Sequence, residues 1–184
     1  MRDEESEHPL RMARRDDLPQ ASTHPARFAA GRLLPRRYPT TMDGYELILI
    51  QCEDDVEAYH RIRHHVLFDG SSAYLREGPD EVREENLSLL LKRHDQPLGT
   101  VRLDQKRDRK AIIRLVAIAS DIQRQGHGTV LMTLLEQRAA SLGIEELFVH
   151  ARPAALGFYT KLGFKPFPFE PDNGESVQLH KVLV

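Results

Sequence analysis

The sequence predicts one α/β domain, in which a mixed and mostly antiparallel sheet carries helices on both faces. Three strand-like segments between residues 87 and 118 are joined by connections too short for a parallel crossover. Before and after them, strand-like segments alternate with segments of helical periodicity. A chain of 184 residues is long enough for one well-buried domain and too short for two full ones.

Residues 1–41 differ in composition from the rest of the chain. The first 40 residues contain five of the eleven prolines and no lysine, and they carry both arginines and acidic residues. Such a segment buries little apolar surface, which predicts a flexible or loosely docked extension. A basic partner-binding segment is the alternative, and the interleaved acids argue against a transit peptide. Met42 is an alternative start, and the domain is predicted over residues 42–184.

The first half of the domain begins with a strand and a helix. Residues 45–52, "YELILIQC", are rich in β-formers and are followed by an acidic cluster suited to a helix N-terminus. A helix is expected over residues 55–68, and its apolar residues fall on one stripe: Val56, Tyr59, Ile62 and Val66. Residues 69–86 are polar and rich in turn formers. A loop of this length in a compact domain is usually functional or mobile, so it is a candidate substrate lip.

Three consecutive strands follow, at residues 87–93, 98–104 and 111–118. Their short connections "HDQP" and "QKRDRK" make neighbouring strands antiparallel, which predicts a meander. After Gly128, apolar residues recur at helical spacing up to Leu142, and Gly143 suits a left-handed C-terminal cap. A helix is therefore expected between these two glycines.

The last elements are a strand, a short helix and a strand. Residues 145–151, "EELFVHA", follow the third strand of the meander through a helix, so the two strands can lie parallel. A short helix is expected over residues 154–162, ending at Gly163. Residues 176–184 alternate between apolar and polar side chains and predict a closing strand.

Composition excludes several functional classes. The formal net charge is -2 and no long run of like charge occurs, so we expect neither a nucleic-acid nor a membrane partner. Cys52 is the only cysteine, which excludes an intramolecular disulfide and a cysteine-based zinc site, and no metal is predicted. No apolar run is long enough to span a bilayer. The expected location is the cytoplasm.

A glycine-containing hexapeptide, "QRQGHG" at residues 123–128, lies between the strand that ends near Ile118 and the helix that begins near Gly128. The first N–H groups of a helix have no intrahelical partner, and glycines allow a phosphate to approach the backbone. On its own, the pattern is more often a ligand-free turn. Neither a dinucleotide fingerprint nor a Walker A loop is present, because Leu131 replaces the third glycine and no G-K-[ST] follows.

Two segments, "LVAIASDIQRQGHGTVLM" at residues 115–132 and "ARPAALGFYTKLGF" at residues 151–164, together resemble the GCN5-related N-acetyltransferase (GNAT) superfamily. "LVAIASDIQRQGHGTVLM" is similar to its acetyl-CoA-binding motif Q/R-x-x-G-x-G/A, matched by Gln123, Gly126 and Gly128. "ARPAALGFYTKLGF" resembles the family's later motif, and the matching residues are Ala155, Phe158, Tyr159, Lys161, Leu162, Gly163 and Phe164. The motifs occur in the expected order, which is far more specific than either alone. The resemblance covers roughly residues 43–184 and is greatest to small single-domain bacterial members.

The resemblance implies the GNAT fold, with a splay between the fourth and fifth strands, and acetyl-CoA as co-substrate. The pyrophosphate would bind the loop backbone, and the pantetheine arm would pair with the fourth strand. Many relatives have Asn where this chain has Arg152, and the alternative to that residue's cofactor contact is that Arg152 meets a coenzyme A phosphate. The implied cofactor-binding residues are Val116, Ala117, Ile118, Gln123, Arg124, Gln125, Gly126, His127, Gly128 and Arg152.

Acetyl transfer needs a proton donor for the departing thiolate and a base for the amine. The resemblance implies that Tyr159 is the donor, with packing against the cofactor as the alternative. Many relatives carry a carboxylate on the fourth strand, where this chain has only Arg114. The remaining candidates for the base are Glu84, Glu85, His150 and a chain of water molecules.

Arg102 and Arg114 interrupt apolar segments on successive strands. Burying an arginine is unfavourable unless it meets a carboxylate, a carbonyl or a ligand. We consider two alternatives. In the first, both arginines line the acceptor pocket and favour a substrate with a carboxylate. In the second, one or both extend out of the sheet to solvent or pair with Asp104 or an acidic residue of a loop.

The resemblance implies an N-acetyltransferase that moves an acetyl group to a primary amine of a small molecule or peptide. The alternative is an acyl-CoA-binding sensor or partner module on the same fold, which the missing base favours. The acceptor, the acyl-chain preference and the oligomeric state stay open, with a homodimer as one option.

Overall fold

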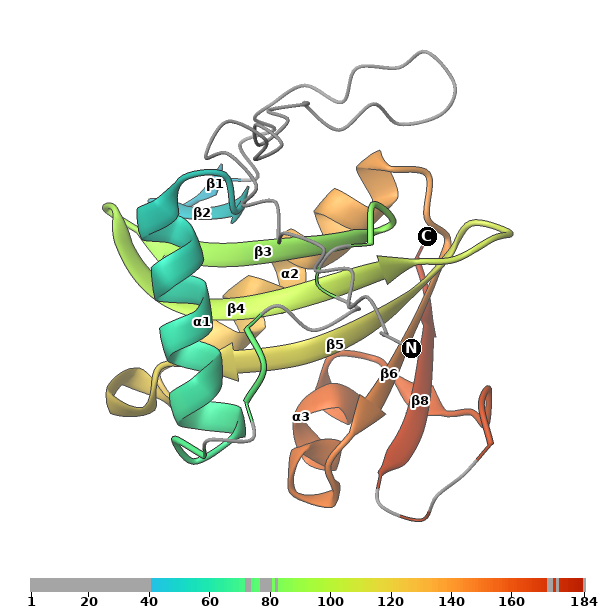
Figure 1. Cartoon of the computed structure of the whole chain (residues 1–184). Coiled ribbons are helices and arrows are strands. Elements are labelled where there is room, and N and C mark those ends of the chain that lie inside the picture. Colours follow the sequence, from blue (N-terminus) through green and yellow to red (C-terminus); the bar gives the residue numbers. More distant parts are fainter. Residues whose placement is uncertain are drawn as a thin grey trace, which may run out of the picture. The chain divides into compact units, whose positions relative to one another are not determined.

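The computed structural model describes residues 41–71, 74–76, 81, 83–171, 174 and 176–183. Over these residues the chain forms the expected mixed sheet with helices on both faces (Figure 1). The extension predicted over residues 1–41 lies outside the described residues except for Thr41, so its flexibility stays a prediction.

The strands form one sheet in the order β1-β2-β3-β4-β5-β6-β8-β7. Their bounds are β1 Thr41–Met42, β2 Tyr45–Leu49, β3 Asn86–Arg93, β4 Gln96–Gln105, β5 Lys110–Ile118, β6 Glu146–Ala151, β7 Lys165–Pro166 and β8 Val177–Val182. Every strand that the sequence predicts is present. β1 and β7 were not predicted, because segments of two residues carry no periodic signal.

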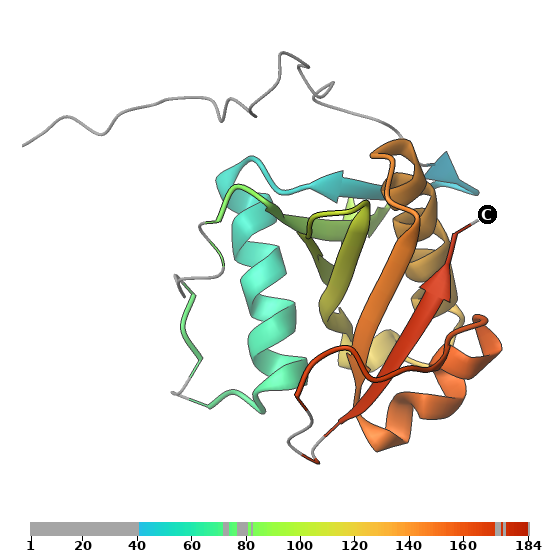
Figure 2. The same ribbon diagram turned by 90° about the vertical axis from the view of Figure 1, so that its right-hand side faces the viewer.

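Two helices of four turns and one short helix cover the sheet. Their bounds are α1 Glu53–Leu67, α2 His127–Ser141 and α3 Leu156–Lys161, with 3₁₀ turns η1 Ser120–Ile122 and η2 Pro153–Ala155. Figure 2 shows α1 on one face of the sheet and α2 and α3 on the other. Gly143 follows α2 with a φ of 76°, which confirms the left-handed cap. None of the described helices is both long and apolar enough to cross a membrane.

Each face of the sheet has its own apolar core. The larger core lies under α2 and includes Leu89 and Val101 from the sheet and Leu131 and Leu135 from the helix, all without exposed surface. The smaller core lies under α1 and is formed by Ala58, Tyr59, Ile62, Leu90 and Ala117. Because successive strand residues point to opposite faces, the run "LSLLLKR" can supply both cores.

β2 to β5 form the antiparallel meander that the short connections predict, and β5 pairs with β6 in parallel. The parallel ladder is short, because it runs only from Lys110↔Glu146 to Ile113↔Val149. Beyond that last pair the two strands diverge (Figure 1). We call this divergence the fork; it corresponds to the expected splay between the fourth and fifth predicted strands.

Leu115 forms a β-bulge at the fork. The β4–β5 register pairs Arg102 with Arg114 and then Thr100 with Ala117, so two β5 residues, Leu115 and Val116, oppose a single β4 residue. Leu115 has a φ of 56°, in the left-handed region that L side chains rarely adopt. The extra residue bends the strand and exchanges the faces to which later residues point.

Candidate functional site

The loop between β5 and α2 has the geometry of an anion-binding helix N-terminus. Gly126 caps α2 with a φ of 90°, and a Cβ at this position would meet nothing within 4 Å. In the first turn of α2 the Thr129 N–H donates to the Gly126 carbonyl at 3.0 Å, and the N–H groups before it are those that a helix N-terminus leaves without an intrahelical partner. Arg124 and Gln125 are exposed beside Gly126, and the Gln123 amide donates to the Ile118 carbonyl at 3.0 Å. The backbone around Gly126 is therefore open to a ligand.

The other two loop residues of the predicted cofactor-binding set, His127 and Gly128, are less exposed. His127 is buried, and its Nδ1 lies 2.9 Å from the Tyr45 hydroxyl. Its imidazole also lines a surface pocket of about 570 Å³ beside the β3–β4 hairpin. Gly128 is half-buried and packs against the ring of Phe158. Any contact of these two residues with a phosphate would involve the backbone.

The edge of β5 that faces the fork is the second part of the site. Val116, Ala117 and Ile118 follow the last residue of β5 that pairs with β6. Among the described residues, no strand pairs with this edge on the β6 side. Unpaired backbone groups on a strand edge can bind an extended chain as an added strand would.

Tyr159 lies on α3 and is buried, with only 5% of its surface exposed. Its ring meets Phe158 and Phe164 edge to face, at centroid distances of 5.1 and 5.6 Å. Burial raises the pKa of Tyr159 to about 12, so the phenol stays protonated. Its hydroxyl has no hydrogen-bond partner among the described residues, which leaves a proton donor available.

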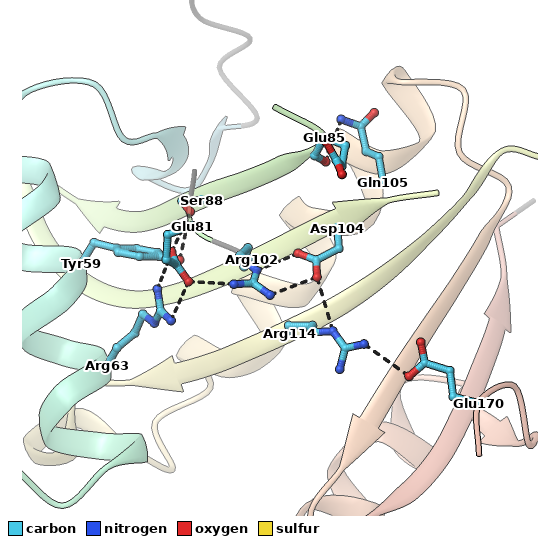
Figure 3. A network of polar contacts seen from close by, with 10 residues as sticks. All are labelled: Tyr59, Arg63, Glu81, Glu85, Ser88, Arg102, Asp104, Gln105, Arg114 and Glu170. Carbon is cyan, nitrogen blue, oxygen red and sulfur yellow. Dashed lines mark hydrogen bonds and ion pairs between the residues drawn. The ribbon is translucent and has the colours of Figure 1, made fainter. Parts of the chain in front are cut away.

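Arg102 is enclosed by two carboxylates on the α1 face of β4 (Figure 3). Its Nε and Nη2 donate to the two carboxylate oxygens of Asp104 at 2.7 and 3.1 Å, and its Nη1 donates to Glu81 at 2.7 Å. Arg63 of α1 donates two further hydrogen bonds to Glu81, at 2.8 and 2.9 Å. These contacts attach Glu81, in the loop between α1 and β3, to both the helix and the sheet.

Arg114 continues these contacts toward the C-terminal strands. Its Nε lies 3.3 Å from Asp104, and its Nη2 lies 3.3 Å from Glu170 (Figure 3). We call the alternating set Arg63, Glu81, Arg102, Asp104, Arg114 and Glu170 the charged row. Both arginines singled out in the sequence therefore pair with Asp104 and a loop acid. Arg114 is one-third exposed, whereas the side chain of Arg102 is 4% exposed.

The charged row controls the ionisation of Glu81. Burial alone would raise the pKa of this carboxyl, but hydrogen bonds and charge from Arg63 and Arg102 outweigh burial and lower it. Glu81 is thus ionised at neutral pH although only 12% of its side chain is exposed.

His150 is the one base candidate from the sequence that the structure places at the fork. It lies near the end of β6, with Nε2 2.7 Å from Glu170 and Nδ1 3.2 Å from the Ser176 hydroxyl. Glu84 and Glu85 are exposed, and Glu85 lies beside Gln105, where β4 pairs with the beginning of β5 (Figure 3).

Glu170 was missed by the sequence analysis. It lies in an irregular segment, "FPFEPDNGES", where no periodicity indicates which side chain faces the sheet.

Arg152 joins the end of β6 to the end of α1, because its Nη2 donates to the Leu67 carbonyl at 3.2 Å. A cation is favourable at a helix C-terminus. Its predicted contact with a phosphate stays a prediction.

No group of His, Cys, Asp and Glu side chains among the described residues could hold a metal ion. The features that the structure brings together are the open loop at Gly126, the unpaired edge of β5 and the charged row at the fork.

Residues 47–164 match the family described as "Acetyltransferase (GNAT) family". Solved structures are similar in fold. The ribosomal-protein-S18-alanine N-acetyltransferase from Escherichia coli has a TM-score of 0.62 at 18% identity, over 76% of this chain and 94% of that one. An aminoglycoside 6'-N-acetyltransferase complexed with coenzyme A has a TM-score of 0.65 at 13% identity, over 75% and 97% of the two chains.

A third similar structure is the PaiA N-acetyltransferase from Thermoplasma acidophilum in complex with coenzyme A. Its TM-score is 0.61 at 17% identity, over 75% of this chain and 98% of that one. At identities this low, the three structures establish a shared fold. The first two are named for different acceptors, so the fold does not select an acceptor for this chain.

Proposed function

Because this chain belongs to the acetyltransferase (GNAT) family, we propose that it transfers an acetyl group from acetyl-CoA to a primary amine. The amine belongs to a small molecule or a peptide and attacks the thioester directly. One observation carries the proposal: the fork between β5 and β6 lies next to an open, glycine-capped helix N-terminus. The fork suits an extended chain that contains amide groups, and the helix N-terminus suits a pyrophosphate.

The residues at these two features fit the parts of coenzyme A. The backbone N–H groups around Gly126 would hold the pyrophosphate, because a helix N-terminus favours negative charge. The free edge at Val116 to Ile118 would hydrogen-bond the pantetheine amides. Bound acetyl-CoA supplies the activated acyl group. Arg124 and Arg152 are exposed cations that would meet its phosphates, with Arg152 leaving the Leu67 carbonyl to do so.

Tyr159 would donate the proton that the leaving thiolate needs. Its raised pKa keeps the phenol protonated, and its hydroxyl forms no competing hydrogen bond with the described residues. The acceptor would approach on the α1 face, where Arg114 is the more exposed of the two predicted substrate-binding arginines. Arg102 would act mainly by holding Asp104 and Glu81 in place.

An acyl-CoA-binding module without turnover is the second candidate. The observation that favours it is that β5 carries Arg114 where many relatives carry a carboxylate. Both candidates require coenzyme A binding, so only turnover separates them.

An acceptor screen tests the proposal. Purified full-length protein is incubated with acetyl-CoA and a panel of amines, and thiol release and product mass are measured. We expect an acetylated product from at least one amine, together with a rise in melting temperature on adding coenzyme A. Coenzyme A stabilisation without any turnover would favour the binding module. Absence of stabilisation at saturating coenzyme A would overturn both candidates.

A further inference from the structure

Glu170 lies over the point where the sheet divides. The last β5–β6 pair is Ile113↔Val149, so Arg114 and His150 are the first residues on the two arms of the fork. Both side chains contact the same atom, Oε2 of Glu170, at 3.3 Å from Arg114 Nη2 and 2.7 Å from His150 Nε2. A single carboxylate therefore connects the two arms at the closed end of the fork.

The backbone of Glu170 is fixed as well. Gln178 of β8 is 7% exposed, and its Oε1 accepts hydrogen bonds from the N–H groups of Phe169 and Glu170 at 2.7 and 2.8 Å. Its Nε2 donates to the Glu170 carbonyl at 2.7 Å. One buried amide thus makes three hydrogen bonds to this short stretch of loop. A carboxylate held in this way is positioned before any ligand arrives.

The second carboxylate oxygen of Glu170 is available. The contacts with Arg114 and His150 both use Oε2, and Oε1 has no partner among the described residues. The side chain is 39% exposed. Burial opposes ionisation of Glu170, but the hydrogen bond from His150 and the charge of Arg114 outweigh it and lower the pKa. The Glu170 carboxylate is therefore ionised and partly exposed, and its contacts with Arg114 and His150 use only one of its two oxygen atoms.

We propose that Glu170 is the catalytic residue that binds the acceptor amine through Oε1 and takes a proton from its nitrogen as the new C–N bond forms. This inference rests on the proposed function. The nitrogen of an amine becomes acidic when it bonds to a carbonyl carbon, so a carboxylate can accept its proton at that stage. The C–S bond then breaks, and the sulfur takes a proton from the Tyr159 hydroxyl. Glu170 afterwards loses its proton to water, and Tyr159 regains one.

The neighbours of Glu170 support this role. Nε2–H of His150 donates to Glu170, and Nδ1 can then accept from the Ser176 hydroxyl, so the imidazole holds the carboxylate without blocking Oε1. Arg114 provides positive charge at the same oxygen. This site suits an amine acceptor, because an ammonium or amine N–H group is complementary to an open carboxylate oxygen.

The test compares Glu170→Gln with a matched control, Glu145→Gln. Glu145 is also an exposed, ion-paired glutamate, since its Oε1 lies 2.6 Å from Arg109 Nη1 with 52% of its side chain exposed. Steady-state kinetics use the best amine from the acceptor screen with saturating acetyl-CoA. We expect E170Q to lower kcat/KM by about 100-fold or more, and E145Q to stay within about twofold of the wild type. The rise in melting temperature with coenzyme A should be the same in all three proteins.

Amine binding provides a readout that does not depend on turnover. Saturation-transfer NMR with spermidine and phenethylamine, in the presence of coenzyme A, should show binding to the wild type and to E145Q that is lost in E170Q. If E170Q fails to fold, Glu170→Asp keeps the charge on a shorter side chain and should retain amine binding with reduced kcat.

Three outcomes separate the two proposals. An active wild type with an inactive E170Q supports both. An active wild type with E170Q as active as E145Q overturns the role of Glu170 and leaves the acetyltransferase intact. If coenzyme A binds but no amine is acetylated, the transferase proposal fails. Amine binding that depends on Glu170 would then still support the amine site, and binding that is absent or unchanged in E170Q would overturn it.

Discussion

Gly128 near the start of α2 packs directly against the ring of Phe158 on α3. A Cβ at Gly128 would lie 3.4 Å from both Cε2 and Cζ of that ring, which is ordinary van der Waals contact. Gly126, two residues earlier, has open space around it but a φ of 90°. Of the two glycines of the loop, only Gly126 is therefore required by its backbone conformation, whereas a Cβ fits at Gly128.

Alanine substitutions should separate the two glycines. Gly126→Ala is expected to lower the free energy of unfolding by about 1–2 kcal/mol, because an L side chain is strained in the left-handed region. Gly128→Ala should change it by less than about 1 kcal/mol, since alanine also suits a helix better than glycine. Urea denaturation measures both values. Equal losses in the two variants would contradict this assignment.

Tyr159→Phe should lower turnover strongly while preserving the fold. Its hydroxyl has no partner among the described residues, so we expect a stability change below about 1 kcal/mol. Loss of the thiolate donor should lower kcat by about 100-fold. Tyr59→Phe is the matched control, because Tyr59 is also buried but donates to the Ser88 hydroxyl at 3.2 Å. Similar kcat values for the two variants would argue against a proton-donor role for Tyr159.

Glu81→Gln should destabilise the protein through the charged row. It removes the carboxylate that pairs with both Arg63 and Arg102, and breaking a buried ion pair typically costs about 3–5 kcal/mol. Since Arg102 keeps Asp104, we expect about 3 kcal/mol. Glu57→Gln breaks the pair with Arg76, in which both side chains are about half exposed, and should cost less than about 1 kcal/mol. Thermal and urea unfolding of both variants provide the comparison.

Acidification should weaken the same contacts. The folded-state pKa values of Glu81 and Glu170 lie below the ordinary value of 4.5. Their stabilising contribution is therefore complete above pH 4.5 and is lost as the pH falls through the lowered values. We expect the free energy of unfolding of the wild type to decrease more steeply below pH 4.5 than that of E81Q. Parallel pH profiles would show that Glu81 does not contribute.

The elements with strong periodicity were predictable from the sequence. The run "LSLLLKR", the short connections of the meander and the glycine after α2 gave strands, pairing and a helix end that the structure confirms. The bulge at Leu115 was not predictable, because "AIIRLVAI" is apolar on both sides of the extra residue. Only the β4–β5 register reveals that the faces exchange there.

The side chains at the fork were predicted only in part. The sequence indicated that Arg102 and Arg114 need partners, and Asp104 lies close enough in the chain to be a candidate. The other partners, Glu81 and Glu170, come from irregular segments on opposite sides of the charged row. Where a side chain of an irregular segment lies depends on long-range contacts, such as the hydrogen bonds from Gln178 to the Glu170 backbone. No local sequence pattern indicates such contacts.

The β5–β6 ladder is a short seam between the two arms of the fork. It has only four residue pairs, so side-chain contacts such as those of Glu170 also hold the arm with the open loop at Gly126 to the arm with Tyr159 and His150. A small rocking motion about this seam would change the distance between the phosphate end of the fork and the side chains that handle protons. A ligand bound along the fork would contact both arms and fix the distance between them. Filling the fork would therefore also tighten the scaffold that surrounds the reacting atoms.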